Sequence, residues 1–198
     1  ANNVLLLTGE TYSKYLHPKD KGNRTIFGDA GSATLISTEG FAEIGNFSLG
    51  TDGKGAENLI VKTGGLRCKS PMNDLTFDEK ANPTSSDYLY MNGSEIFNFT
   101  IEAVPELVKN TLLKNKLTND EIEGFIFHQA NKFMLNFLRK KLKISEEKFY
   151  YYMSGVGNTV SSTIPIVLYE KLKDYGIWEV KERIEEAEDH LLSYNNRI

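Results

Sequence analysis

The sequence predicts an α/β fold in which short strands and amphipathic helices pack in layers. Residues 124–173 alternate short apolar runs with apolar positions at helical spacing, in the order strand, helix, strand, helix. Residues 1–61 instead contain short apolar runs separated by glycine-rich turns, which is typical of strands. The 198 residues are 40% hydrophobic and 25% charged, a composition typical of a globular chain with a buried core.

The first half of the chain is expected to contain several strands and one long loop. Residues 4–7 are an apolar run, and residues 25–36 form a second one that is broken by the glycine-rich stretch 28–32. Residues 41–49 alternate imperfectly and precede a glycine-rich turn and residues 59–61, so we expect an antiparallel pair. Residues 66–87 are polar and contain two prolines, which predicts a long irregular excursion.

The second half is predicted to alternate helices and strands. Apolar residues at helical spacing indicate a core-facing helix over 94–115, with Pro105 as a local distortion. A strand, a helix, a strand and a helix then follow at residues 124–127, 131–142, 149–153 and 161–173. A strand–helix–strand connection of this length is typical of parallel strands, so the carboxyl ends of both strands should share one sheet edge.

Polar residues follow both of these strands. His128 ends the first strand, and Asn158 follows the second through a glycine-containing turn. The parallel topology therefore predicts that the two residues meet at the edge where α/β folds bind ligands. Taken singly, His128 is also explained as a capping or core histidine, and Asn158 as a turn residue. Their joint placement is what indicates a site.

Charge and cysteine content exclude several classes of function. With 23 basic and 27 acidic residues, the net charge of −4 argues against a global surface for nucleic acid or an anionic membrane. No stretch approaches the roughly 18 apolar residues of a spanning helix. The single cysteine, Cys68, excludes an intrachain disulfide and a cysteine-pair zinc site, and favours a reducing compartment, by default the cytoplasm. The start at Ala1, without Met, leads us to expect a fragment or a processed product.

Four segments together resemble a known family. They are residues 27–33 (FGDAGSA), 91–97 (MNGSEIF), 127–131 (FHQAN) and 157–165 (GNTVSSTIP). In this order they closely resemble the signatures of the 3-oxoacyl-acyl-carrier-protein synthase III family, over roughly residues 3–177. Asn158 in its glycine turn favours this initiating type over elongating condensing enzymes, which use two histidines. The His-Gln-Ala-Asn run makes plant-type polyketide synthases a poorer match.

The resemblance implies a thiolase-like fold of two similar halves and a Cys-His-Asn active site. Residues 1–39 would be a remnant of the N-terminal half, and residues 40–198 the C-terminal half with an atypical end from about 179. A cysteine would accept an acyl group from coenzyme A, and malonyl carrier protein would lose carbon dioxide and attack that thioester, with no cofactor. His128 and Asn158 would donate hydrogen bonds to the enolate oxygen, each lowering the barrier by roughly 3–4 kcal/mol.

The resemblance also implies contacts with the substrates. The pantetheine arm of coenzyme A or carrier protein would touch Gly93, Phe97, Ala130 and Asn131. A basic helix would dock an acidic carrier protein through Lys132, Arg139, Lys140, Lys141 and Lys143. Without the resemblance these residues read as a turn, a packed aromatic ring and a solvated helix face. Phe133 stands where the family usually has an arginine, which weakens the case for a phosphate contact.

The chain departs from the family at both ends. The family nucleophile lies upstream of the first strand, so we expect it outside this chain, and we expect Cys68 to be a plain thiol. Residues 179–189 read as an acidic helix where the family has strands and a glycine-rich loop. The expectation is a condensing enzyme, an acyltransferase, whose present chain is inactive alone and which is a homodimer when complete. Two alternatives stay open: a noncatalytic half-domain that binds coenzyme A or carrier protein, and acyl transfer to an alcohol or amine.

Overall fold

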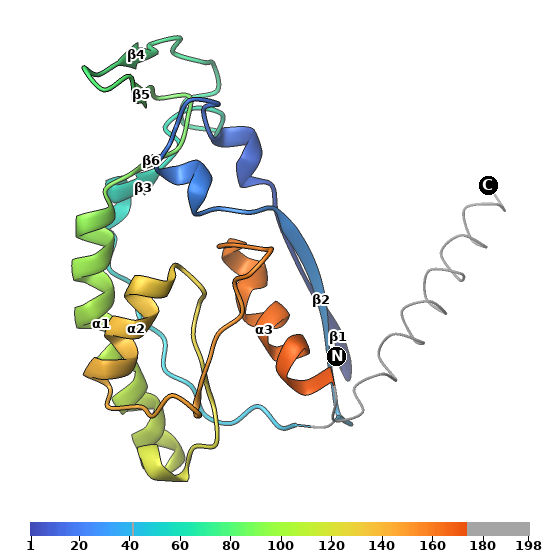
Figure 1. Cartoon of the computed structure of the whole chain (residues 1–198). Helices are drawn as coiled ribbons and strands as arrows, with labels where there is room; N and C mark the ends of the chain where they lie inside the picture. The colour runs from blue at the N-terminus through green and yellow to red at the C-terminus, as the bar shows by residue number, and fades with distance from the viewer. Residues whose placement is uncertain (41, 174–198) are drawn as a thin grey trace, which may run out of the picture.

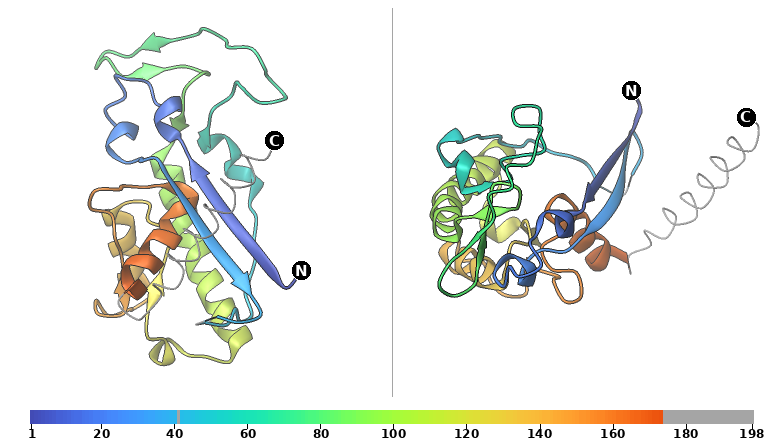
Figure 2. Two further views of the ribbon diagram at one scale, coloured as in Figure 1. Left: turned by 90° about the vertical axis from the view of Figure 1, so that its right-hand side faces the viewer. Right: turned by 90° about the horizontal axis from the view of Figure 1, so that it is seen from above.

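The computed structural model describes residues 1–40 and 42–173 and has an α/β architecture (Figure 1). Strands β1 (Asn3–Glu10) and β2 (Ala30–Ser37) form an antiparallel ribbon with Asn3 opposite Ser37 and Glu10 opposite Ala30. This ribbon runs along helix α3 (Thr163–Leu172), as two further views show (Figure 2). The strand predicted at residues 4–7 is confirmed, whereas residues 25–29 precede β2 rather than forming part of a strand.

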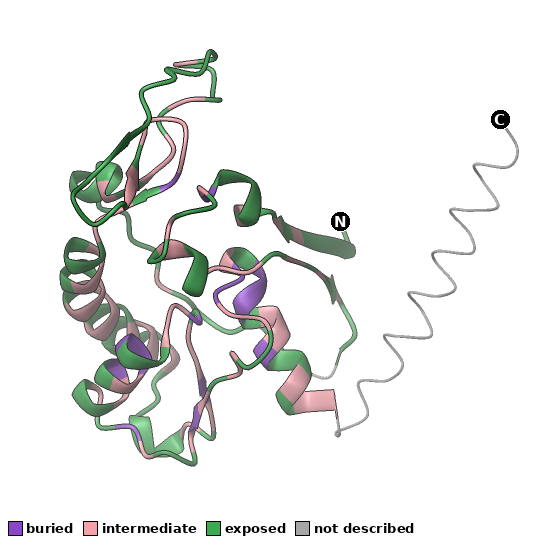
Figure 3. Cartoon of the chain, turned by 45° about the horizontal axis from the view of Figure 1, so that its top comes forward, coloured by how far each residue is buried: buried purple, intermediate pink, exposed green. Residues whose placement is uncertain are grey.

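The predicted alternation in the second half is confirmed. Strands β7 (Phe125–Ile126) and β8 (Phe149–Tyr150) are parallel and are connected through helix α2 (Lys132–Lys141). A short 3-10 turn, η5 (Val160–Ser162), then leads into α3. The buried core cluster consists of Phe125, Leu135, Ile144 and Phe149, and burial is concentrated in α2, α3 and the strands between them (Figure 3).

Helix α1 (Gly93–Asn115) lies beside α2 and matches the predicted helix closely. The side chain of Asn92 caps its start by accepting a hydrogen bond from the backbone N–H of Glu95. The helix runs through Pro105 and ends at Asn115, and the following residue, Lys116, adopts the left-handed conformation common at helix ends.

The antiparallel pair expected from residues 41–49 and 59–61 is wrong. Strand β3 (Leu59–Ile60) pairs instead with β6 (Tyr90–Met91), and residues 42–52 form no regular element. The large side chains of the expected strand are exposed: Ile44 by 71%, Phe47 by 61% and Leu49 by 87%. Because the alternation there is imperfect, the segment has no single apolar face to bury against a neighbouring strand.

The predicted excursion at residues 66–87 is confirmed, with one short hairpin in it. Strands β4 (Thr76–Phe77) and β5 (Pro83–Thr84) pair at the end of the molecule drawn at the top of Figure 1. Carboxylates stabilise this loop: Asp87 accepts the backbone N–H groups of Met72 and Asn73, each at 2.9 Å. Hydrogen bonds from Ser86 and Ser85 lower the pKa of Asp74 to about 2.

Four further 3-10 turns complete the described elements. They are η1 (Tyr12–Tyr15), η2 (Asn23–Thr25), η3 (Gly53–Asn58) and η4 (Asn119–Glu121). Among the described helices, none combines the length and the apolar character needed to cross a membrane. The acidic helix predicted from residue 179 lies outside the described residues.

Candidate active site

His128 lies just beyond β7, as predicted. His128 is exposed as a residue, but its Nδ1 atom lies 2.8 Å from the hydroxyl oxygen of Thr163, a residue that is only 2% exposed. Partial removal of the ring from water lowers the pKa of His128 below 6.5, and the backbone carbonyl of Val160 opposes this shift. Because the ring is also solvent-exposed, water screens part of the effect. His128 is therefore favoured in its neutral form.

Asn158 is buried, with 6% of its surface exposed, and its backbone is bonded on both sides. Its N–H donates to the carbonyl of Ile26 at 2.8 Å, and its carbonyl accepts the N–H of Gly28 at 3.0 Å. Its side-chain oxygen accepts the N–H of Val160 at 3.0 Å. This last bond fixes the amide so that the Nδ2 atom, which is a donor only, points away from Val160.

The glycine-rich segment 27–33 is what holds the Asn158 backbone in place. Phe27 forms an isolated parallel bridge with Asn158, and a β-carbon on Gly28 would meet the carbonyl oxygen of Val156 at 2.1 Å. Gly157 adopts a φ of +67°, a conformation that other residues seldom take. The first and last of the four recognisable segments therefore make one structural unit.

Val160 joins the two candidate residues. Its φ of +52° is in the left-handed region, which is strained for a β-branched residue. In this conformation its N–H reaches the Asn158 side chain, and its carbonyl accepts the Thr163 hydroxyl at 2.9 Å. Thr163 in turn contacts His128, so hydrogen bonds connect His128 to Asn158 through Thr163 and Val160. Strained backbone held by such bonds is common at functional sites.

Two models of one protein family match this chain. The model described as 3-Oxoacyl-[acyl-carrier-protein (ACP)] synthase III matches residues 1–53, and the model of its C terminal part matches residues 112–179. The chain belongs to this family. The resemblance to this family is thereby confirmed, and three of the four segments, 27–33, 127–131 and 157–165, lie within the matched residues. The fold is thiolase-like.

Several 3-oxoacyl-acyl-carrier-protein synthases III are similar in sequence or structure. The putative enzyme of Campylobacter jejuni is 34% identical over 172 residues, 84% of this chain and 48% of its own. That of Clostridium perfringens is 35% identical over 175 residues, 88% of this chain and 52% of its own. A crystal structure with this family name superposes with a TM-score of 0.82 at 46% identity, covering 89% of this chain and 53% of that one. The chain spans about half the length of the curated relatives it matches.

The residues predicted to contact pantetheine lie at the starts of α1 and α2. Gly93 is the first residue of α1, and Asn131 caps α2 by accepting the N–H of Met134 at 2.8 Å. The backbone N–H of Ala130 donates to the carbonyl of His128 at 3.0 Å. Phe97 packs its ring against Phe133 and Phe137, with ring centroids 5.7 and 5.1 Å away. These contacts bring Phe97 of α1 next to α2, but they also explain Asn131 and Phe97 structurally.

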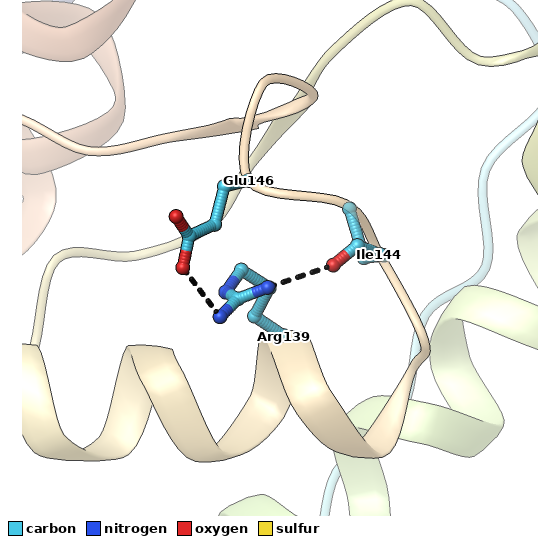
Figure 4. A network of polar contacts seen from close by, with 3 residues as sticks. All are labelled: Arg139, Ile144 and Glu146. Atoms are coloured by element: carbon cyan, nitrogen blue, oxygen red, sulfur yellow. Dashed lines mark hydrogen bonds and ion pairs between the residues drawn. The ribbon is translucent and has the colours of Figure 1, made fainter.

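The predicted docking cations differ in their surroundings. Arg139 is engaged within the fold: it donates to the carbonyl of Ile144 at 3.2 Å and to Glu146 at 2.8 Å (Figure 4). Lys141 donates to the carbonyl of Ile101 at 2.6 Å. Lys132 lies over the ring of Tyr151, 5.9 Å from its centroid. Lys140 is exposed, and its side chain has no hydrogen bond or ion pair within the described part of the chain.

Neither Cys68 nor two surface cavities belong to this site. The cavities, about 620 and 380 Å³, are lined by residues of η1, η3, β3 and β6, of the excursion and of the segments next to them. His128 and Asn158 line neither cavity. Cys68 lies in the excursion, where its thiol donates to the carbonyl of Ser70 at 3.7 Å. The excursion leads into the β4–β5 hairpin, at the opposite end of the molecule from the β7–β8 pair (Figure 1).

Sequence reasoning missed three residues that organise the site. Gln129 is 1% exposed and bridges the ends of β7 and β8, donating to the carbonyl of Phe127 and accepting from the N–H of Tyr152. A polar residue directly after a buried strand was the available signal. Val160 and Thr163 were passed over because neither a backbone angle nor a side-chain hydrogen bond can be read from residue type.

Proposed function

We propose that this chain supplies the histidine and asparagine of a 3-oxoacyl-acyl-carrier-protein synthase III, which joins an acyl thioester to malonyl carrier protein with loss of carbon dioxide. The observation that carries the proposal is the hydrogen-bonded path from His128 through Thr163 and Val160 to Asn158. It links the two polar residues that follow neighbouring parallel strands. The family name of the relatives supports the same reaction.

The two residues have the chemistry that decarboxylation requires. Loss of carbon dioxide from a malonyl thioester leaves an enolate, whose oxygen gains negative charge in the transition state. Donors held ready for that oxygen lower the barrier, each by roughly 3–4 kcal/mol. The amide of Asn158 is oriented by Val160, so its Nδ2 atom is preorganised as a donor. His128 supplies the second group, at an exposed position that Thr163 and Val160 connect to Asn158.

The nucleophile in this proposal lies outside the 198 residues. Cys68 is a poor candidate because it is half-buried in the excursion and forms no hydrogen bond with His128 or Asn158. Arg67 and Lys69 flank Cys68, but the proposed mechanism needs a thiol beside His128 and Asn158, and neither of these residues lies in the excursion. We expect the chain alone to make no carbon–carbon bond.

The substrates and surroundings of the proposed enzyme follow from the same family. Acyl-coenzyme A and malonyl carrier protein are the substrates, and no cofactor takes part. Their pantetheine arm would run along Gly93, Phe97, Ala130 and Asn131, and the carrier protein would dock on Lys132, Arg139, Lys140 and Lys141. A homodimer, a cytoplasmic location, and a division of the chain near residue 39 are parts of the proposal.

Release of carbon dioxide tests the proposal most directly. The assay uses the chain joined to a cysteine-bearing N-terminal part of the family, with malonyl carrier protein as substrate. His128→Ala and Asn158→Ala should each slow release about a hundredfold or more, and acylation of the cysteine should persist in Asn158→Ala. In the double variant the activation free energy of decarboxylation should rise by less than the sum of the rises in the two single variants, because both donors act on one oxygen. Asn98→Ala, at an exposed position of α1, is the control.

The same assay separates the alternatives. Near-normal carbon dioxide release in both single variants would reject the roles of His128 and Asn158. Cysteine acylation without carbon dioxide release in the unsubstituted assembly, followed by transfer to an added alcohol or amine, would indicate an acyltransferase of another kind. Binding of coenzyme A without acylation would indicate a noncatalytic half-domain.

A further inference from the structure

Two consecutive hydrogen bonds, from the His128 ring to the Thr163 hydroxyl and from there to the Val160 carbonyl, determine which nitrogen of His128 carries a proton. The Nδ1 atom of His128 lies 2.8 Å from the hydroxyl oxygen of Thr163, and that oxygen lies 2.9 Å from the carbonyl oxygen of Val160. Both distances are those of hydrogen bonds. Thr163 and its hydroxyl are buried, so the two bonds are not replaced by bonds to bulk water.

Only one placement of the protons satisfies both bonds at once. A hydroxyl has a single proton to donate, and a carbonyl oxygen can only accept. Thr163 must therefore donate to Val160 and accept from His128. The proton of the neutral imidazole is then on Nδ1, and Nε2 has a free lone pair. The opposite placement would leave the oxygens of Thr163 and Val160 at 2.9 Å with no proton between them.

We propose that Thr163 is a positioning residue that holds His128 in the Nδ1–H tautomer and leaves Nε2 as a proton acceptor. The strained conformation of Val160 supports this role, because it turns the carbonyl toward Thr163 while the N–H of the same residue orients Asn158. The backbone of one residue thus orients the amide of Asn158 and, through Thr163, fixes the tautomer of His128. The same bonds suit the imidazolium ion, which also carries a proton on Nδ1.

The catalytic consequence rests on the proposed function. In its neutral form His128 cannot donate to an enolate oxygen through Nε2, so it must first take up a proton there. A thiol is the class of donor that the reaction supplies: its S–H bond breaks, an N–H bond forms at Nε2, and a thiolate faces an imidazolium ion. The thiolate then takes the acyl group, and coenzyme A leaves as a thiolate that takes its proton from solvent. Nε2–H is thereby retained and can donate to the enolate oxygen. Asn158 needs no such step, since its amide is a donor in every state.

The tautomer can be read in the chain itself, without substrate or turnover. The ¹⁵N-labelled chain is studied by long-range ¹H–¹⁵N correlation of its histidine rings, at a pH well above the pKa of His128. His128→Gln identifies the signals of His128 among those of the three histidines. We expect Nδ1 to show the shift of a protonated nitrogen and Nε2 that of an unprotonated one. The reverse assignment in the unsubstituted chain would overturn the proposal.

Variants of Thr163 test whether this residue sets the tautomer. Thr163→Val keeps the side-chain shape but removes the hydroxyl, so the protonated-nitrogen shift should move from Nδ1 toward Nε2. Thr163→Ser restores the hydroxyl and should restore the original pattern, a rescue that a merely structural role would not produce. Unchanged histidine shifts in Thr163→Val would overturn the proposal, and if that variant fails to fold, the pattern in the unsubstituted chain and in Thr163→Ser still decides. Because no catalysis is measured, failure here is distinct from failure of the decarboxylation test.

Discussion

A β-carbon on Gly28 would lie 2.1 Å from the carbonyl oxygen of Val156, so only glycine fits between these two segments. The atom of Val156 in this contact belongs to the backbone, and a backbone atom cannot move aside as a flexible side chain would. Gly28 therefore allows residues 26–28 to bond the Asn158 backbone on both sides.

Gly28→Ala should destabilise the chain by about 1–3 kcal/mol, because the two segments must separate to admit the methyl group. The measurement is chemical denaturation followed by circular dichroism. Gly50→Ala is the matched control, since a β-carbon there would have no atom within 4 Å. Equal stability of the two variants would contradict the close approach of Gly28 to Val156.

Gln129 should contribute substantially to the stability of the fold. Its amide bridges the carbonyl of Phe127, at 2.6 Å, and the N–H of Tyr152, at 3.0 Å. Gln129→Leu would leave both backbone groups buried without a partner, at a cost of about 2 kcal/mol or more in unfolding free energy. Asn98→Leu on the exposed face of α1 should change stability by less than about 0.5 kcal/mol. A loss no larger than that of the control would show that the bridge is dispensable.

The strain at Val160 predicts an unusual response to glycine. Val160→Gly removes a penalty of about 1–3 kcal/mol for the left-handed conformation, which offsets the lost side chain and the greater freedom of the unfolded chain. We expect this variant to be as stable as the original chain within about 0.5 kcal/mol, or more stable. Val156→Gly is the control, a half-buried valine outside the left-handed region, and should lose about 1 kcal/mol. If Val160→Gly lost as much unfolding free energy as Val156→Gly, the left-handed backbone of Val160 would not be strained.

Local patterns predicted the fold where pairing partners are near in sequence or joined by a regular helix. The parallel strands β7 and β8 were predictable because α2 between them has clear helical spacing. The pairing of β3 with β6 was not, because some thirty residues of irregular chain separate the two strands. With no pattern in the excursion, the sequence favoured the nearest segment, residues 41–49, which was wrong.

For the candidate site, the sequence indicated the residues but not their connections. His128 and Asn158 were expected together from the positions of the strand ends, and the structure connects them through Val160 and Thr163. The glycines at 28 and 157 were visible as turn residues, but their packing against each other's segments depends on contacts more than a hundred residues apart. Such contacts leave no periodic signal in one sequence.

The basic residues of α2 should separate into structural and docking roles. Arg139 has 17% of its side chain exposed and donates to the carbonyl of Ile144, so Arg139→Ala should cost about 1–2 kcal/mol of unfolding free energy. Its partner Glu146 is 81% exposed, so the ion pair itself contributes little. Lys140→Ala should change stability by less than about 0.5 kcal/mol, because Lys140 is exposed on the same helix.

Binding of a carrier protein distinguishes the roles further. If α2 is the docking helix, Lys140→Ala should weaken binding, and the difference from the original chain should shrink as salt is raised. Fluorescence anisotropy with labelled carrier protein at low and high salt measures both effects. Unchanged binding in Lys140→Ala would remove Lys140 from the docking surface.

The lowered pKa of His128 predicts how stability should depend on pH. The unfolded chain protonates this histidine near its ordinary pKa of 6.5, whereas the folded chain does so at lower pH because the ring has partly lost contact with water. As pH falls through 6.5, the unfolded state therefore binds more protons than the folded state, and the unfolding free energy decreases. His128→Gln should reduce this decrease, measured by denaturation from about pH 8 to about pH 5. His17→Gln leaves His128 in place and should retain the contribution of His128. A pH dependence that is identical in the His128→Gln variant and the original chain would contradict the assigned direction of the shift.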